Sequence, residues 1–264
     1  MAGHRRFCGR FCAAPAENTR DGGVAFPYIR WMDDVRISTV DHGWFVRPGS
    51  ETADAVPRVV PLRGYVVRHP RGVLLLDTGI GAHPETDAHY RPRRHGLDEA
   101  LGVAGLSVGD VDVVVNCHLH FDHCGGNPAF TRAPVVVQSV ELAAARGQDY
   151  TLPGLVDAPG VRYDVVDGDA EVWPGVTVVA TPGHTAGHQS LVVRRPDGEV
   201  VVLAGQSHET ASDFAADALA LSAADDAGRD GGPLPVPPAW VGRLLALDPR
   251  EVRFAHDDAV WLPR

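Results

Sequence analysis

The segment His118–His123 constrains what this chain can fold into more than any other feature. It reads His-Leu-His-Phe-Asp-His, so three imidazoles and one carboxylate fall within six positions. A buried polar group without a partner costs roughly 1–3 kcal/mol, so the cluster needs either solvent or a shared partner such as a transition-metal ion. It follows an apolar β-branched run at 111–115 and precedes Gly125-Gly126, which predicts a strand, a ligand loop and a turn. We interpret it as a metal site at a strand end, and a solvated histidine-rich loop is the alternative.

Further ligands must come from other parts of the chain, because one such cluster supplies at most four. His184 follows the apolar run 176–180, and His256 follows the short apolar run 252–254. Alone, either residue is more typical of a structural histidine. Together with the cluster at 118–123, both become candidate ligands at strand ends, where a buried sheet would hold them rigidly.

Composition narrows the function classes. The 264 residues carry 44% hydrophobic and 22% charged residues, which is typical of a globular protein. The formal net charge of −10 argues against a nucleic-acid partner held by phosphate contacts, and the basic stretch 91–95 reads as a solvated loop face. No apolar run approaches the roughly 18 residues of a membrane span, and the arginines near the N-terminus precede no apolar signal region. Four scattered cysteines do not form a disulfide framework, so we expect a cytoplasmic protein.

The order of predicted elements indicates the architecture. Residues 1–30, with Cys8 and Cys12, are expected to be a weakly structured leader, and 31–264 a single hydrolase domain. Predicted strands cover 65–67, 73–76, 111–115, 135–137, 176–180, 191–193, 200–203 and 252–254. Predicted helices cover 97–106, 139–145, 213–221 and a stretch from Pro237 to Asp248. Residues 42–60 and 80–96 are expected to be irregular loops, with Trp44, Phe45 and Tyr90 as ordinary packing residues. Mixed strands and helices with hairpins in each half favour two sheets packed face to face with helices outside.

Four segments, taken in order, resemble the metallo-β-lactamase fold superfamily. They are Asp77-Thr78-Gly79, the cluster at 118–123, Gly183-His184 and Ala255-His256-Asp257. Within the superfamily, residues 120–127 and 254–257 resemble the N-acyl homoserine lactonase branch. The resemblance implies an α+β fold, a four-layer αβ/βα sandwich with the site at the sheet edges. It also implies His118, His120 and His184 on one metal ion, Asp122, His123 and His256 on a second, and Asp77 orienting the ligands. Zinc is the default ion, and iron or manganese is compatible with these ligand types.

One departure from the family pattern affects the second ion. Where the family places a bridging carboxylate between the last two histidines, this chain has Gln206. An amide offers one oxygen and no charge, so we expect the second ion to bind weakly or to be absent in dilute metal. Gln206, His208 and Glu209 are the candidates for a weak or substitute ligand. Glu209 also stands three positions further on, where many lactonases have a substrate-contacting tyrosine, so it is a candidate substrate-binding residue.

The leading functional hypothesis is metal-dependent hydrolysis of an ester-type bond in a small molecule, with a lactone as the substrate class. Metal-bound hydroxide would attack the carbonyl carbon, and Asp122 is the candidate catalytic carboxylate that orients it or passes a proton to the leaving group. Thioester hydrolysis of the glyoxalase-II or acyl-carrier type needs the same chemistry and is the first alternative. A non-catalytic metal-binding member, favoured by Gln206, is the second. The sequence does not determine the oligomeric state.

Overall fold

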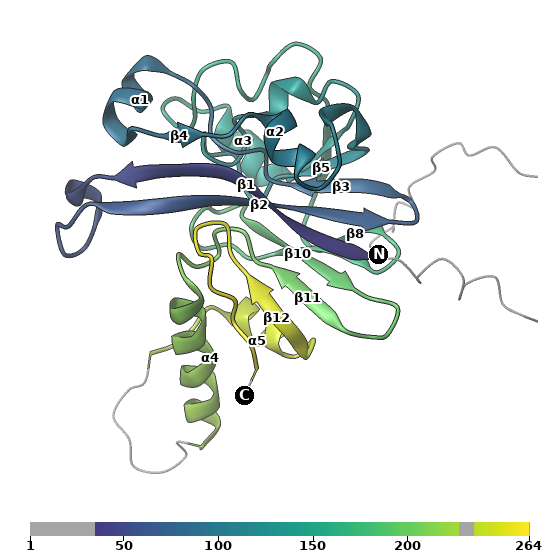
Figure 1. Cartoon of the computed structure of the whole chain (residues 1–264). Coiled ribbons are helices and arrows are strands. Elements are labelled where there is room, and N and C mark those ends of the chain that lie inside the picture. Colours follow the sequence, from purple (N-terminus) through teal and green to yellow (C-terminus); the bar gives the residue numbers. More distant parts are fainter. Residues whose placement is uncertain (1–34, 227–234, 264) are drawn as a thin grey trace, which may run out of the picture.

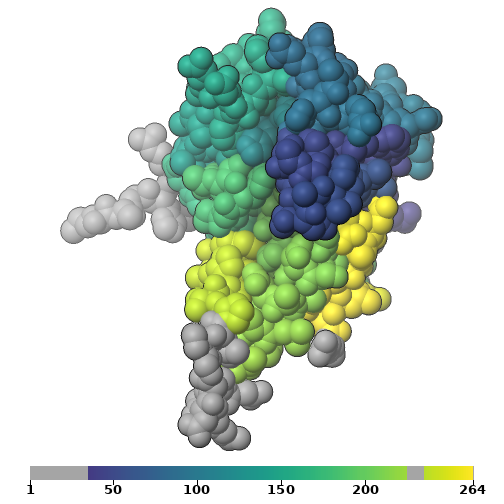
Figure 2. Space-filling model, turned by 90° about the vertical axis from the view of Figure 1, so that its left-hand side faces the viewer, coloured from purple at the N-terminus to yellow at the C-terminus, as the bar shows by residue number. Residues whose placement is uncertain are grey.

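Two β-sheets pack face to face in the computed structural model, which describes residues 35–226 and 235–263 (Figure 1). The predicted leader at 1–30, with Cys8 and Cys12, lies outside the described residues. The first sheet has the order β4-β1-β2-β3-β5-β6-β7, and the second has the order β12-β11-β10-β9-β8. In Figure 2 the blue and teal surface of the N-terminal half lies above the green and yellow surface of the C-terminal half.

The elements have the following bounds. The strands of the first sheet are β1 (Arg36–Arg47), β2 (Arg58–His69), β3 (Gly72–Leu76), β4 (Arg93–Arg94), β5 (Val113–Val115), β6 (Val135–Gln138) and β7 (Tyr163–Val166). Those of the second are β8 (Ala170–Trp173), β9 (Val176–Ala180), β10 (Gln189–Arg194), β11 (Val200–Leu203) and β12 (Pro249–Arg253). The α-helices are α1 (Pro84–Tyr90), α2 (Leu97–Gly102), α3 (Ser139–Ala145), α4 (Ala211–Asp226) and α5 (Ala239–Leu245). Short 3-10 turns occupy Gly49–Glu51, Val108–Asp110 and Asn127–Ala129.

Alternation of side chains along the strands produces three apolar layers. Between the sheets, Val67 and Leu76 from the first meet Val178 and Leu191 from the second. Their neighbours in sequence point outward, because successive strand residues face opposite sides. On the outer face of the first sheet, residues such as Val66 and Leu75 pack with Leu101 of α2. On the outer face of the second, Val192 and Val202 pack with Phe214 of α4 and Trp240 of α5. The result is the four-layer αβ/βα sandwich that the sequence analysis expected.

The N-terminal region differs from the sequence expectation. Residues 42–47 and 58–60, expected to be irregular, belong to the long antiparallel pair of β1 and β2. A register shift between Asp41 and Gly43 interrupts the alternation of β1 and hides the strand pattern. Gly43 has a φ of 103°, and a Cβ there would lie 1.9 Å from the carbonyl oxygen of Arg93, so only glycine fits beside β4. The stretch 80–96 likewise contains α1 and β4 rather than only loop.

Strand direction gathers the candidate ligands at one edge of the sandwich. In the first sheet β3, β5 and β6 are parallel, and in the second β9, β11 and β12 share one direction because β10 is antiparallel to both β9 and β11. The loop holding the 118–123 cluster follows β5, His184 follows β9, and His256 follows β12.

Within the described residues, none of the helices combines the length and apolar character needed to span a membrane.

Candidate metal centre

Three histidines from two sheets meet in a first ligand set. His118 and His120 follow β5, and His184 follows β9; their candidate ligand atoms all lie within 4.8 Å of one another. Nδ1 of His120 lies 3.1 Å from Nε2 of His184. Nitrogens bound to one tetrahedral zinc ion, at 2.0–2.1 Å from it, would be ~3.3 Å apart. The buried Nε2 of His118 has no hydrogen-bond partner in the part of the chain that the structure describes. The first set therefore fits a metal ion, which would give this nitrogen its missing partner.

The electrostatics of the first set favour neutral imidazoles. Burial lowers the pKa of His118 well below its ordinary value, and the neighbouring histidines lower it further. Burial and His120 lower the pKa of His184 to about 4. The pKa of His120 is also lowered, mainly by burial, although the charge of Asp122 opposes the shift. A metal ion binds only the neutral form of imidazole, so these three side chains are ready to bind without losing a proton.

A second ligand set adjoins the first. Oδ2 of Asp122 lies 3.5 Å from Nε2 of His123 and 3.4 Å from Nε2 of His256. The two imidazole Nε2 atoms are 3.2 Å apart. Oε1 of Gln206, in the turn that follows β11, lies 3.0 Å from Nε2 of His123. These are separations that ligand atoms of one ion would have.

Hydrogen bonds outside the second set fix which imidazole nitrogens carry protons. Nδ1 of His123 donates to Oδ2 of Asp77 at 2.9 Å, and Nδ1 of His256 donates to the carbonyl oxygen of Pro61 at 3.0 Å. Because Nδ1 of each ring is engaged in this way, Nε2 of each ring faces Asp122 and the other ring. Burial would lower the pKa of His123, but the acidic groups Cys117, Asp122 and Asp77 raise it well above its ordinary value. The second set thus stabilises a cation, either a proton on His123 or a metal ion.

Asp122 combines burial with an ionised carboxylate. Burial acts to raise its pKa, but the charges of His123 and His256 outweigh that effect and the net shift is downward. It lines a pocket of about 280 Å³ with His120 and His184, beside an aromatic wall of Phe45, Tyr90 and Phe121. The Tyr90 ring centroid lies 5.4 Å from that of Phe45 and 5.4 Å from that of Phe121. Phe45 and Tyr90, expected to be only packing residues, therefore also line this pocket, which Arg47, Glu51, Gln206 and Glu209 complete.

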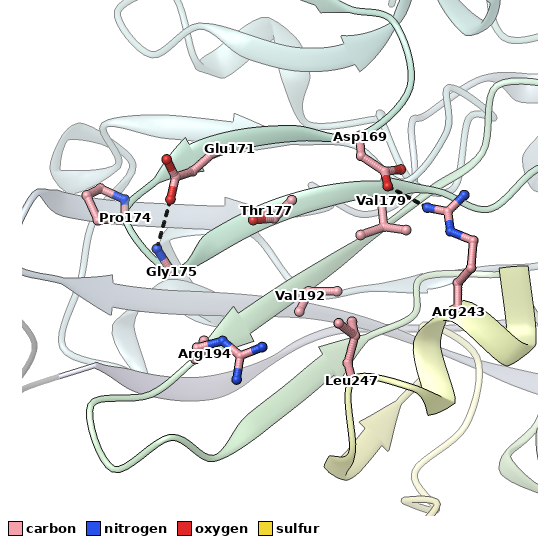
Figure 3. Close-up of a pocket in the computed structure, with 10 residues that line it drawn as sticks. All are labelled: Asp169, Glu171, Pro174, Gly175, Thr177, Val179, Val192, Arg194, Arg243 and Leu247. Atoms are coloured by element: carbon pink, nitrogen blue, oxygen red, sulfur yellow. Dashed lines mark hydrogen bonds and ion pairs between the residues drawn. The ribbon is translucent and has the colours of Figure 1, made fainter.

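A larger cavity of about 530 Å³ lies elsewhere, on the outer face of the second sheet (Figure 3). Its floor includes Val179 and Val192, and an ion pair of 2.5 Å joins Arg243 to Asp169 at one end. Among the described residues that line it there is no histidine or cysteine. The candidate ligands His120, Asp122 and His184 line the smaller pocket instead.

The structure brings most of the expected site residues together, but not all. The six expected ligands converge, with Asp77 behind His123. The interpretation of His208 as a substitute ligand is wrong. Its ring packs against Phe214, Trp240 and Phe254 on the outer face of the second sheet, and its Nε2 lies 3.2 Å from Oδ2 of Asp217. His208 and Glu209 lie in the bend between β11 and α4, where His208 turns to the outer layer and Glu209 lines the pocket.

Two buried polar residues outside the expected set support the site. Glu141 of α3 is fully buried and accepts hydrogen bonds from Leu119 N at 2.8 Å, from Thr185 Oγ1 at 2.7 Å and from the Tyr150 hydroxyl. It joins the loop of His118 and His120 to the loop of His184. A charged residue on the buried side of an apolar helix was the available signal.

His188 is the second supporting residue. Its Nδ1 contacts the Thr181 hydroxyl at 2.8 Å and the Thr181 carbonyl oxygen at 3.2 Å, and its Nε2 accepts from Gln206 N at 3.1 Å. The carbonyl requires a proton on Nδ1 and the Gln206 N–H requires a lone pair on Nε2, so the ring is neutral. Burial, followed by the charges of His184 and His123, lowers the pKa of His188 to about 3. Its place four residues after His184 was the only sequence signal.

Comparison with known proteins agrees with this geometry. The model of the metallo-beta-lactamase superfamily matches residues 63–209, and the chain belongs to that superfamily. It is 31% identical over 171 residues to an N-acyl homoserine lactonase of Bacillus cereus, covering 59% of this chain and 67% of the relative. It is 29% identical over 167 residues to the N-acyl homoserine lactonase AttM of Rhizobium radiobacter, covering 54% of this chain and 64% of AttM.

Solved structures give the same result. A mutant of AiiA from B. thuringiensis, with N-decanoyl-L-homoserine bound at its active site, has a TM-score of 0.66 and 25% identity, covering 84% of this chain and 93% of AiiA. An N-acyl homoserine lactone hydrolase with N-hexanoyl-L-homoserine at its catalytic metal centre gives the same TM-score, identity and coverage. Fold, site and relatives together define a metallo-hydrolase of the lactonase branch. The comparisons give no support to the thioesterase and non-catalytic alternatives.

Proposed function

We propose that this metallo-hydrolase opens the ester bond of a lactone, with N-acyl homoserine lactones as the substrate class to test first. The observation that carries the proposal is the convergence of two sets of ligand atoms beside one pocket. The relatives named N-acyl homoserine lactonase support the choice of substrate, and so does the product bound at the metal centre of a structural neighbour.

We assign one cation to each of the two ligand sets. His118, His120 and His184 hold the first cation, and Asp122, His123 and His256 hold the second, with Gln206 as a weak additional ligand. Zinc is the expected ion, because imidazole and carboxylate ligands in a tetrahedral arrangement suit it. When bound, zinc would polarise the substrate carbonyl and lower the pKa of water towards neutrality.

The side chains of the chain supply the remaining functions. Asp122 is ionised at neutral pH and faces the pocket, so it can accept a proton from the attacking water. As the acyl carbon–oxygen bond breaks, the same carboxyl can return that proton to the leaving alkoxide. The product then carries an alcohol and a carboxylic acid, which releases its proton at neutral pH. The wall of Phe45, Tyr90 and Phe121 would contact the apolar part of the substrate.

Turnover of a lactone by the zinc-loaded full chain tests this proposal. Ring opening of N-hexanoyl homoserine lactone releases a carboxylic acid proton, which a pH indicator detects. We expect turnover by the wild type, a loss of about a thousandfold or more for His118→Ala, and a large loss for Asp122→Asn. Absence of turnover across a panel of lactones with different acyl chains would refute the lactonase proposal. Equal turnover by wild type and His118→Ala would refute the residue assignment.

A further inference from the structure

The side chain of Gln206 bridges the second ligand set and a carboxylate outside it. It is 4% exposed. Oε1 lies 3.0 Å from His123 Nε2, and Nε2 donates to Oε1 of Glu209 at 2.8 Å. Its backbone N–H donates to His188, so the main chain is fixed as well. The amide oxygen, the amide nitrogen and the backbone N–H of Gln206 therefore each have a defined partner.

Hydrogen-bond complementarity decides which end of the amide faces the ligands. The two ends of a glutamine amide have nearly the same shape, so neighbours determine its orientation. A carboxylate can only accept, and Glu209 therefore requires the NH₂ group of Gln206. The opposite orientation would place two acceptor oxygens 2.8 Å apart, with no proton between them. Glu209 thus forces the carbonyl oxygen of Gln206 towards His123.

An arginine from the other sheet holds Glu209 in place. Nη1 of Arg47, at the end of β1, lies 2.9 Å from Oε2 of Glu209, while Oε1 accepts from Gln206. Both carboxylate oxygens are therefore engaged. The Arg47 guanidinium also lies 5.9 Å from the centroid of the Phe45 ring. Arg47 ends a strand of the first sheet and Glu209 follows a strand of the second, so this ion pair joins the two sheets within the pocket that both residues line and limits the movement of Glu209.

We propose that Glu209 is a positioning residue, which fixes the Gln206 carbonyl oxygen as a neutral ligand of the second cation. The other ligands of that ion are Asp122, His123 and His256, so the inference rests on the residue assignment of the proposed function. Glu209 acts through Gln206 and donates no ligand itself. Its negative charge also polarises the amide to which it is bonded and increases the electron density on Oε1. Where the family pattern has a bridging carboxylate, this chain has the Gln206 amide, and the carboxylate of Glu209 lies on the far side of that amide.

Stepwise zinc binding to the full chain tests this role without measuring turnover. The metal-free protein is titrated with zinc against a chromophoric chelator, which gives one dissociation constant for each ion. For the wild type we expect two ions, the second bound more weakly. Glu209→Gln should weaken the second ion about 10- to 100-fold, the range found when a residue that orients a ligand is replaced. The first dissociation constant should be unchanged. Glu51→Gln is the matched control, because Glu51 lines the same pocket and bonds to His89 and Tyr90 instead.

The same Glu209 substitution, made in a Gln206→Met variant, shows whether Glu209 positions the amide or binds the ion directly. Gln206→Met removes the amide while keeping a side chain of similar length. If Glu209 acts only through the amide, Glu209→Gln will have no further effect on the second dissociation constant in that background. An undiminished effect there would overturn the inference, and so would an unchanged second dissociation constant for Glu209→Gln alone. A wild type that takes up only one ion overturns it while leaving the lactonase proposal intact. If two ions bind but no lactone is turned over, the lactonase proposal is refuted and this inference is left intact.

Discussion

The two ligand sets of this protein lie side by side but differ in how their side chains are satisfied. In the first set the buried Nε2 of His118 has no partner among the described residues, and burial keeps the imidazoles neutral. In the second set His123 contacts Asp122, His256 and Gln206, and nearby acidic groups raise its pKa. The first set therefore lacks a cation unless a metal ion binds, whereas a proton on His123 can take the place of a metal ion in the second set. We infer that the two sites of one fold bind metal with different strength for this reason.

Removing one histidine from each set should separate the two sites most clearly. His118→Ala should abolish binding of the first ion and lower lactone turnover about a thousandfold or more, since the metal contributes several kcal/mol to the transition state. His256→Ala should remove only the second ion and cause a smaller loss. Elemental analysis of each purified variant, together with kcat/KM, measures both effects. Equal losses in the two variants would mean that the sites are not functionally distinct.

Glu141 offers a way to loosen the first set without touching a ligand. Glu141→Ala leaves the buried Leu119 N–H and the Thr185 hydroxyl without their acceptor. The expected cost is about 3–5 kcal/mol of unfolding free energy, measured by urea denaturation of the metal-free protein. Val140→Ala, on the exposed side of the same helix, is the control and should change stability by about 0.5 kcal/mol or less. A similar small change in Glu141→Ala would contradict the proposed link between the two loops.

The pH dependence of metal binding should differ between the sets. Because the pKa of His123 is raised, the second ion must displace a proton, and its affinity should rise about tenfold per pH unit up to that pKa. The first ion meets imidazoles with lowered pKa values, so its affinity should be nearly constant from pH 6.5 to 8. Zinc titrations at several pH values measure both slopes. A flat response at both sites would show that His123 carries no proton in the metal-free protein.

The smallest expected effect belongs to Arg47. Arg47→Met breaks the ion pair with Glu209 but keeps the bond between Glu209 and Gln206, so the second dissociation constant should rise only a few-fold. The pair is partly exposed, and stability should change by about 1 kcal/mol or less. Arg58→Met, which breaks the exposed pair with Asp54, is the matched control and should leave metal binding unchanged. A loss as large as that of Glu209→Gln would mean that Arg47 itself determines the orientation of Gln206.

Much of the fold was predictable from local pattern. Apolar runs such as 73–76 and 200–203 are strands in the structure. Each forms an antiparallel hairpin with the strand before it, β2 with β3 and β10 with β11, as expected. Strand β1 was missed because a bulge at Asp41 and Gly43 breaks the alternation on which the prediction depends. The helix after β6 covers Ser139–Ala145 as expected, and its N-cap is Gln138, the last residue of that strand. Such boundaries depend on the end of the preceding strand.

The sequence by itself determined which residue types stand at which strand ends, because ligand types and strand periodicity can be recognised in short stretches of chain. That was enough to name the six converging residues and the superfamily. Only the tertiary structure decided that His208 faces the outer layer, that Glu141 joins two ligand loops and that Glu209 orients Gln206. Each of these depends on the direction of a side chain relative to segments far away in the sequence. Packing of the two sheets sets those directions, and a linear pattern does not contain them.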